Sequence, residues 1–289
     1  MRARAFLLLA AAGCVSLDLP MESTGGAPVV PPPPPTGSSA IRDVGAADAG
    51  SLRLLWPEPR DPTYAAWREA MLRDGRFEAW FAHLDEALAL PHDVPILHEE
   101  CGIANAFYDP ERRSVHLCYE LLEVVASVMA REVGGADAPA ATGGAWLFVA
   151  LHETGHALVD AYDLPVTGRE EDAVDDFAAL VLLHDGAPDA ALDAATFWGL
   201  TEDWQTSAEE FADEHSLNAQ RYFALLCDVV GADPEGYGWI VDEGYLPESR
   251  AARCVYEHEK KAGSWARLLD DAWVEERTLV ESETSRGSL

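Results

Sequence analysis

Basic residues are scarce in this chain. The sequence has 20 Lys and Arg against 51 Asp and Glu, which gives a formal net charge of −31 over 289 residues. A surface of this charge repels nucleic acid and anionic lipid headgroups, because both carry negative charge themselves. We therefore expect no nucleic-acid partner, and we expect contact with a membrane only through an attached lipid.

Long apolar runs are also absent beyond the N-terminus. No later segment reaches the roughly 18 consecutive apolar residues of a membrane-spanning helix. The segment Met1–Cys14 has two arginines, a short apolar run and then Gly13-Cys14, a pattern typical of an export signal. Small residues before a cysteine predict a lipobox, so that the mature chain begins at a lipidated Cys14. An ordinary signal peptide with an incidental cysteine is the alternative.

Residues 15–51 contain little that a folded core could bury. They hold five consecutive prolines, Pro31–Pro35, among many Gly, Ser and Ala. This composition predicts a linker in which a stiff polyproline segment interrupts a flexible tether. Such a tether suits a domain held away from a membrane, so we expect an exported lipoprotein of the cell envelope, periplasmic or in the outer membrane.

Cysteines are few. Besides Cys14 there are four, Cys101, Cys118, Cys227 and Cys254, and an even number in an exported chain indicates disulfides. Three pairings are possible. We predict Cys101–Cys118, because these two flank a hairpin-like stretch, and Cys227–Cys254, because both lie in the C-terminal helical region. None lies near the histidine motif, so we expect none to bind metal.

The segment Trp146–Tyr162 carries the clearest chemical signal. His152 and His156 are four residues apart, on the same face of a helix, and Glu153 follows the first of them. Two imidazoles so placed can bind one Zn²⁺, and the glutamate can act as the general base. Gly155 costs a helix interior about 1 kcal/mol relative to Ala, which indicates close approach by another element. The alternative is a core helix with two hydrogen-bonded histidines.

A third metal ligand is predicted at the start of the next helix. Thr167 with Glu170 three residues later resembles a capping box, which gives Glu170 a structural role. Glu171 is then the first acidic residue free to bind metal. Asp175, four residues on, could accept the second N–H of a ligand histidine. A solvated acidic first turn is the alternative, but the apolar run Phe177–Leu183 follows directly, and carboxylates leading a buried helix need a partner.

If the metal activates a water for amide hydrolysis, Glu153 would be the base that takes the proton of this water and later protonates the leaving amine. A second group must donate a hydrogen bond to the oxyanion. His215, Arg221 and Tyr222 are the candidates, all within one predicted helix. Each has a structural alternative: a capping or core histidine, an arginine paired to a carboxylate, or a core tyrosine.

A folded domain is predicted over residues 52–274, followed by a flexible tail at 275–289. Its helices are predicted at Tyr64–Leu90, Leu121–Glu132, a helix that includes His152–Tyr162, Gly168–His184, Trp204–Val230 and Ser249–Trp273. Its strands are predicted at Ile96–Cys101, Ile103–Tyr108 and Ser114–Tyr119. Gly134–Gly144 is predicted to be a loop. The fold class is therefore α+β, mostly helical, with a small antiparallel sheet upstream of the motif helix.

The pattern HExxH followed by Glu-x-x-x-Asp resembles the gluzincin zinc metallopeptidases. A metzincin would carry a third histidine where this chain has Tyr162. More narrowly, the chain resembles a bacterial metallopeptidase family, domain of unknown function 4344, over about Trp80 to Trp273. The matching motifs are Cys101-Gly102, Asn105-Ala106-Phe107-Tyr108, Cys118-Tyr119-Glu120-Leu121, the stretch His152–Asp160, Gly168-Arg169-Glu170-Glu171-Asp172, Asp213-Glu214-His215-Ser216, Gln220-Arg221, Leu246-Pro247, Arg250-Ala251, Cys254 and Ser264-Trp265. The resemblance implies a zincin-like fold and peptidase chemistry, but no particular substrate.

Three functions remain after this reasoning. The first is a monomeric zinc metallopeptidase of the cell envelope that cleaves a peptide or protein. The second is a zinc-binding lipoprotein without catalysis, and the third is a degenerate peptidase fold used as an interaction module. Glu153 favours the first over the second, because a pure metal carrier has no need of a carboxylate at the open position. The intact set His152, His156 and Glu171 argues against the third.

Overall fold

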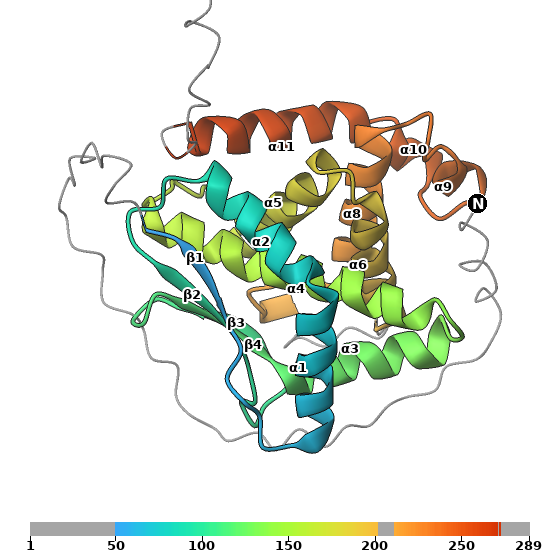
Figure 1. Cartoon of the computed structure of the whole chain (residues 1–289). Coiled ribbons are helices and arrows are strands. Elements are labelled where there is room, and N and C mark those ends of the chain that lie inside the picture. The colour runs from blue at the N-terminus through green and yellow to red at the C-terminus, as the bar shows by residue number, and fades with distance from the viewer. Residues whose placement is uncertain (1–49, 202–210, 271, 273–289) are drawn as a thin grey trace, which may run out of the picture. The chain divides into compact units, whose positions relative to one another are not determined.

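A computed structural model of the chain describes residues 50–201, 211–270 and 272 (Figure 1). The predicted lipidation site Cys14, the linker as far as residue 49 and the tail 275–289 lie outside these residues. The described part is a mostly helical α+β domain with a small sheet. None of its helices combines the length and apolar character that crossing a membrane requires.

The sheet is mixed, so the predicted antiparallel sheet is wrong. Its strands are β1 (Leu52–Leu55), β2 (Val94–Glu99), β3 (Ala106–Asp109) and β4 (Ser114–Cys118), in the spatial order β1-β2-β4-β3. Only β3 and β4 form an antiparallel hairpin, whereas β2 runs parallel to both β1 and β4. The reason is topological. A helical crossover joins β1 to β2, and the chain from β2 to β4 passes through β3, which takes the edge of the sheet.

Glycines explain two differences between the predicted and the observed helices. The predicted helix Tyr64–Leu90 is two helices, α1 (Pro62–Asp74) and α2 (Arg76–Ala87), because Gly75 between them adopts a left-handed conformation with φ of 68°. The predicted loop Gly134–Gly144 is helical from residue 138 onward. At Gly144 a Cβ atom would lie 3.0 Å from the Cα of Ala190. This glycine therefore permits close helix packing and does not mark a loop.

The helix α4 (Ala138–Ala161) runs through the middle of the domain (Figure 1). It packs against α3 (Tyr119–Glu132), α5 (Glu170–His184), α6 (Pro188–Leu200) and the strands β3 and β4. The sequence did not lead us to predict α6. The residues Leu147–Leu151 of α4 are all buried, as expected of a helix that is enclosed on several sides.

The C-terminal part is more broken than predicted. Its helices are α8 (Asn218–Ala232), α9 (Trp239–Asp242), α10 (Glu248–Ala251) and α11 (Cys254–Leu268). Of the predicted helix Trp204–Val230, residues 204–210 lie outside the described part, and residues 213–217 are not helical. The predicted helix Ser249–Trp273 is divided between α10 and α11, and Trp273 is outside the described part.

Both predicted disulfides are present. Cys101–Cys118, with a Cα–Cα distance of 5.4 Å, ties the loop after β2 to the end of β4. Cys227–Cys254, with a Cα–Cα distance of 5.0 Å, ties α8 to the first residue of α11. The first bridge therefore fixes the two ends of the segment that carries β3, next to α4.

Candidate metal centre

The two motif histidines lie on α4 beside Gly155, where α5 packs closely against it. His152 is 4% exposed and Glu153 is 7% exposed. A Cβ atom at Gly155 would lie 2.8 Å from the Cβ of Val174 on α5. The close approach that we inferred from this glycine is thus observed, and it brings the acidic first turns of α5 against the histidines.

The predicted capping box at the start of α5 is wrong. The N-cap residue is Arg169 and no side chain caps the helix, so Thr167 lies outside it and Glu170 is the first helical residue. Because the helix begins later than expected, the Glu170 side chain is free. Its Oε1 accepts a hydrogen bond from Nδ1 of His156 at 2.7 Å. Glu170 therefore orients a motif histidine.

Three residues bring metal-ligating atoms together. The ligand atoms of His152, His156 and Glu171 all lie within 4.8 Å of one another. Nε2 of His152 is 3.1 Å from Oε2 of Glu171, and Nε2 of His156 is 3.3 Å from Oε1. Two imidazole nitrogens and one carboxylate form a donor set that suits Zn²⁺ and leaves one coordination position open.

A second carboxylate fixes the His152 ring. Nδ1 of His152 donates to Oδ1 of Asp175 at 2.7 Å. Arg221 holds Asp175 from the other side with Nε at 2.7 Å and Nη2 at 2.6 Å, and its guanidinium lies 3.7 Å above the Trp198 ring. Burial opposes the charge on Asp175, but Arg221 and His152 outweigh it and lower the pKa of this carboxyl. Asp175 thus remains ionised and accepts the Nδ1 proton.

These hydrogen bonds test whether the residues fit a metal. Asp175 and Glu170 take the Nδ1–H groups of His152 and His156, so in the neutral rings that metal binding requires each Nε2 presents a lone pair that faces Glu171. Although His152 Nε2 is only 3.1 Å away, the buried Oε2 of Glu171 has no hydrogen bond among the described residues. Lone pairs and a carboxylate facing one another call for a cation between them, and the site therefore fits Zn²⁺.

His215 comes close to this centre without joining the three ligands. Its Nε2 lies 3.2 Å from Oε2 of Glu171, and its ring stacks near-parallel to that of His152 with centroids 6.3 Å apart. Asp213 accepts from both the backbone N–H and Nδ1 of His215 at 2.9 Å. The Glu171 carboxylate beside the ring raises the pKa of His215 to about 9. The residue thus presents an N–H donor beside the ligands.

The other two oxyanion candidates are placed differently. Arg221 borders the cavity, but its guanidinium is engaged by Asp175. The ring of Tyr222 lies against α6, where a Cβ at Gly199 would be 2.9 Å from it, and it is not among the residues that line the cavity. Burial raises the pKa of Tyr222 to about 12. His215 also precedes α8, so the three candidates do not share one helix.

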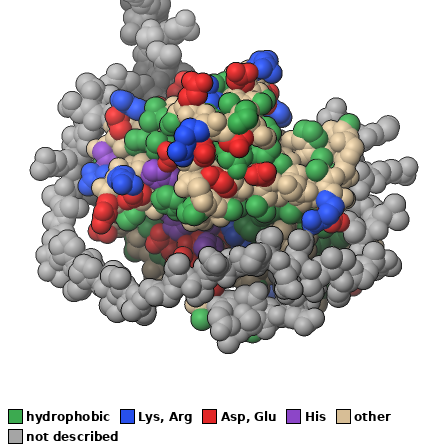
Figure 2. Space-filling model, turned by 90° about the horizontal axis from the view of Figure 1, so that it is seen from below, with side chains coloured by type: hydrophobic (Ala, Val, Ile, Leu, Met, Phe, Trp, Pro, Cys, Tyr) green, Lys and Arg blue, Asp and Glu red, His purple; other side chains and the backbone are tan. Residues whose placement is uncertain are grey.

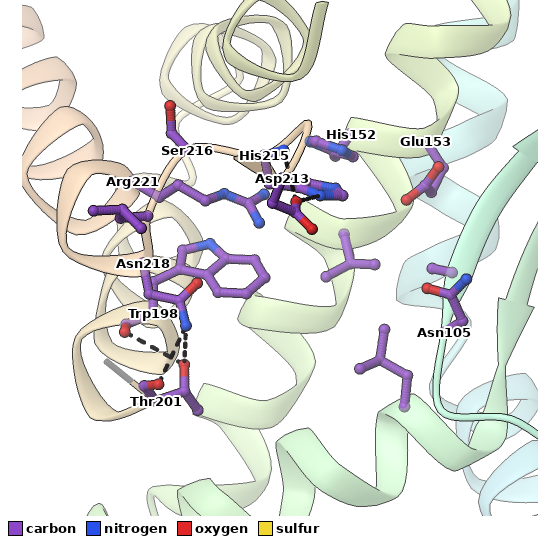
Figure 3. Close-up of a pocket in the computed structure, with 14 residues that line it drawn as sticks. Asn105, His152, Glu153, Trp198, Thr201, Asp213, His215, Ser216, Asn218 and Arg221 are labelled. Atoms are coloured by element: carbon purple, nitrogen blue, oxygen red, sulfur yellow. Dashed lines mark hydrogen bonds and ion pairs between the residues drawn. The ribbon is translucent and has the colours of Figure 1, made fainter. Parts of the chain in front are cut away.

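A cavity of about 360 Å³ opens in front of these residues (Figure 3). Its lining includes His152 and Glu153 from α4, Asn105 and Ala106 at β3, and Asp213 and His215 before α8. In the view of Figure 3, Glu153 and Asn105 lie on the right, Arg221 and Trp198 on the left, and His215 between them. Burial raises the pKa of Glu153, and the neighbouring histidines offset this only in part.

Sequence reasoning missed three residues of this site. Glu170 was assigned to a cap because its spacing from Thr167 matched one. Asp213 could have been found, since an aspartate two residues before a histidine commonly bonds that residue's backbone N–H. Trp198 lies on α6, which we did not predict, so only the structure places it under Arg221.

Comparison with known families agrees with this geometry. Residues 56–269 match domain of unknown function 4344, described as a putative metallopeptidase. The chain belongs to this family. A search of the curated proteins and a search of the solved structures each found no match. The family supplies a class of chemistry, and the details must come from the residues themselves.

Proposed function

We propose that this protein is a zinc-dependent peptidase that hydrolyses peptide bonds in the cavity beside Glu153. The observation that carries the proposal is the meeting of His152, His156 and Glu171 next to a buried carboxylate. Zn²⁺ held there would act as a Lewis acid and lower the pKa of a water in its open position to about 7. The remaining steps belong to side chains of the chain.

Glu153 is proposed as the general base and then the general acid. Its carboxylate lines the cavity on the same helix as the two histidines. Burial raises its pKa, which brings it toward the neutral range where a base and an acid can both operate. Glu153 would take a proton from the attacking water and return it to the departing amine.

His215 is proposed as the donor to the oxyanion. Asp213 accepts from Nδ1 of His215, and the raised pKa of this imidazole keeps Nε2 protonated as well, so it can donate at the cavity that His215 lines. A donor held in place before the reaction needs no reorganisation when charge develops, and losing one such donor costs about 10²–10³-fold in kcat. Arg221 is proposed to act through Asp175, because its guanidinium is already engaged there.

The edge strand β3 is proposed to hold an extended substrate. Cys118 N–H bonds the carbonyl of Asn105 at 3.2 Å, so alternation along the hairpin directs the backbone groups of Ala106 and Tyr108 away from β4. Asn105 and Ala106 also line the cavity. A peptide could therefore add to this edge by main-chain hydrogen bonds. A sheet whose edge borders the motif helix supports a zincin-like fold.

A place at the cell envelope is also proposed. The two disulfides suit an oxidising compartment, and the sequence predicts export with a lipid on Cys14. In the face shown in Figure 2, acidic side chains lie among hydrophobic and basic ones. Fractionation of cells that express the Cys14→Ala chain tests the anchor. We expect the variant to leave the membrane fraction. If its signal segment is cleaved and the chain still stays with the membrane, the anchor lies elsewhere.

A peptide-library cleavage assay on the zinc-loaded chain tests the enzyme proposal. We expect the parent to cleave a subset of peptides, and Glu153→Gln to keep its zinc and lose about 10²–10⁴-fold in turnover, since the amide cannot accept the proton. Equal cleavage by parent and variant would exclude Glu153 as the base. A parent that cleaves nothing while zinc passes readily to an acceptor would instead indicate a metal carrier.

A further inference from the structure

The first turn of α5 contacts the segment that carries His215 at two points. Nη1 of Arg169 donates to the backbone carbonyl of His215 at 2.7 Å. Oγ of Ser216 donates to Oδ1 of Asp172 at 2.6 Å. The two contacts stand on either side of Glu171 in the sequence. The turn that supplies the third metal ligand therefore also holds the segment with the proposed oxyanion donor.

Asp213 alone cannot fix His215 relative to the metal ligands. It accepts from the ring and the backbone N–H of His215, but it belongs to the same non-helical segment and would move with it. The His215 side chain is 43% exposed, so surrounding packing restrains it little. Contacts to another element are needed, and in the described part of the chain α5 provides them. Glu171 lies against the His215 ring, while Arg169 and Asp172 hold the backbone and Ser216.

Arg169 is free to make this contact because of how α5 begins. It is the N-cap residue, its backbone is extended, and its side chain makes no capping hydrogen bond. The guanidinium reaches across to a carbonyl 46 residues further along the chain. A hydrogen bond from a charged donor is stronger than one between neutral groups. A single turn thus fixes His156 through Glu170, supplies Glu171 and restrains the His215 backbone.

We propose that Arg169, with Asp172 in support, is a positioning residue that holds His215 against the metal centre. This rests on the proposed role of His215 in the peptidase reaction. Arg169 touches no reacting atom, so its removal leaves the ligands and Glu153 in place and lets His215 drift. Misplacement of a catalytic group by about 1 Å can cost about 10²-fold.

Steady-state kinetics of Arg169→Ala on a quenched-fluorescent peptide, built from the best-cleaved library sequence, tests the proposal. We expect kcat to fall by up to about 10²-fold while KM and zinc content stay within about twofold of the parent. Arg169→Lys keeps one charged donor and is expected to recover most of the loss. Arg131→Ala, which removes an arginine paired with its neighbour Glu132, is the matched control and is expected to match the parent.

A double-mutant cycle separates positioning from general structural support. If Arg169 acts through His215, adding Arg169→Ala to His215→Ala is expected to change kcat no further. Losses that multiply in the double variant would overturn the proposal, and so would a loss of zinc in Arg169→Ala. Ser216→Ala removes the second contact and is expected to lower kcat in the same direction.

Hydrogen exchange gives a readout that does not depend on turnover. In zinc-loaded Arg169→Ala, the backbone amides of residues 213–217 are expected to exchange faster than in the parent, while those of α4 are unchanged. Exchange equal to the parent in this segment would overturn the positioning role even if kcat falls. If the parent cleaves no peptide, the proposed function fails, and faster exchange alone then decides whether Arg169 holds the segment.

Discussion

The pKa values of two buried histidines in this domain are shifted in opposite directions because their neighbours differ. His98 is 0% exposed and His152 is 4% exposed. His98 stacks on Trp56 with centroids 3.9 Å apart, meets the edge of Phe77, and has no hydrogen bond to either ring nitrogen among the described residues. Burial lowers its pKa to about 3. Burial opposes charge at His152 too, but Asp175 and Glu171 outweigh it and raise that pKa.

The comparison shows what turns a buried histidine into a candidate metal ligand. The aromatic rings around His98 carry no negative charge or hydrogen-bond acceptor that would offset the cost of burying a protonated ring, so it stays neutral and serves the core. Carboxylates around His152 stabilise a proton or a cation and also set which nitrogen is free. Both carboxylates, Glu171 and Asp175, come from the first turns of α5. The surroundings of His152 therefore depend on one helix that packs closely against α4.

Asp175→Asn is expected to produce the largest change, because it removes one of the two carboxylates that His152 has beside it and His98 lacks. The variant leaves the buried Arg221 without its charged partner, and breaking a buried pair in this way costs about 3–5 kcal/mol of unfolding free energy. Zinc affinity is expected to fall by about 10–100-fold, the usual effect of removing a residue that hydrogen-bonds a metal-binding histidine. Denaturant unfolding and competitive zinc titration measure the two effects. Parent-like values in both would show that Asp175 is not needed.

His98→Phe tests the low pKa of His98 through the pH dependence of the unfolding free energy. With a folded pKa of about 3 and an unfolded value of roughly 6.5, the unfolded chain binds one more proton between these limits. The unfolding free energy therefore falls as the pH falls below about 6.5, by about 1.4 kcal/mol per pH unit from this residue.

The phenylalanine variant lacks this proton uptake. Between pH 7 and pH 5 the parent is therefore expected to lose about 2 kcal/mol more of its unfolding free energy than the variant loses. Urea unfolding at the two pH values gives the difference directly, and other titrating groups cancel in the comparison. An equal pH dependence in parent and variant would mean that His98 takes up its proton in the folded state.

The smallest effect is expected at a third histidine, His116. Its Nδ1 bonds Glu99 at 2.5 Å and its Nε2 bonds Ser114 at 2.9 Å. One carboxylate and one hydroxyl give hydrogen bonds but no second or third metal ligand. His116→Gln is expected to cost about 1 kcal/mol of stability and to leave zinc content unchanged. Zinc loss in this variant would show that it disturbs more than these hydrogen bonds.

The sequence predicted those parts of the site that depend on spacing along one helix. The face shared by His152 and His156 and the spacing of Asp175 from Glu171 follow from helical periodicity, whereas Glu171 itself was chosen through a capping box that does not form. The parts that depend on tertiary packing were missed. Gly144 indicated a loop until α6 was seen against it, and the hydrogen bond of Glu170 to His156 requires the true start of α5. The mixed sheet depends on a crossover that no local pattern in β1 reveals.

Zinc content, measured by mass spectrometry of metals on purified chains, tests the metal centre most directly. The parent and His116→Gln are expected to carry one Zn²⁺ per chain, while His156→Ala and Glu171→Ala carry close to none. Comparison with His116→Gln separates loss of a ligand from loss of any buried histidine. Glu171→Ala with as much zinc as the parent would contradict the account, because the carboxylate on which both Nε2 atoms converge would then not be a ligand.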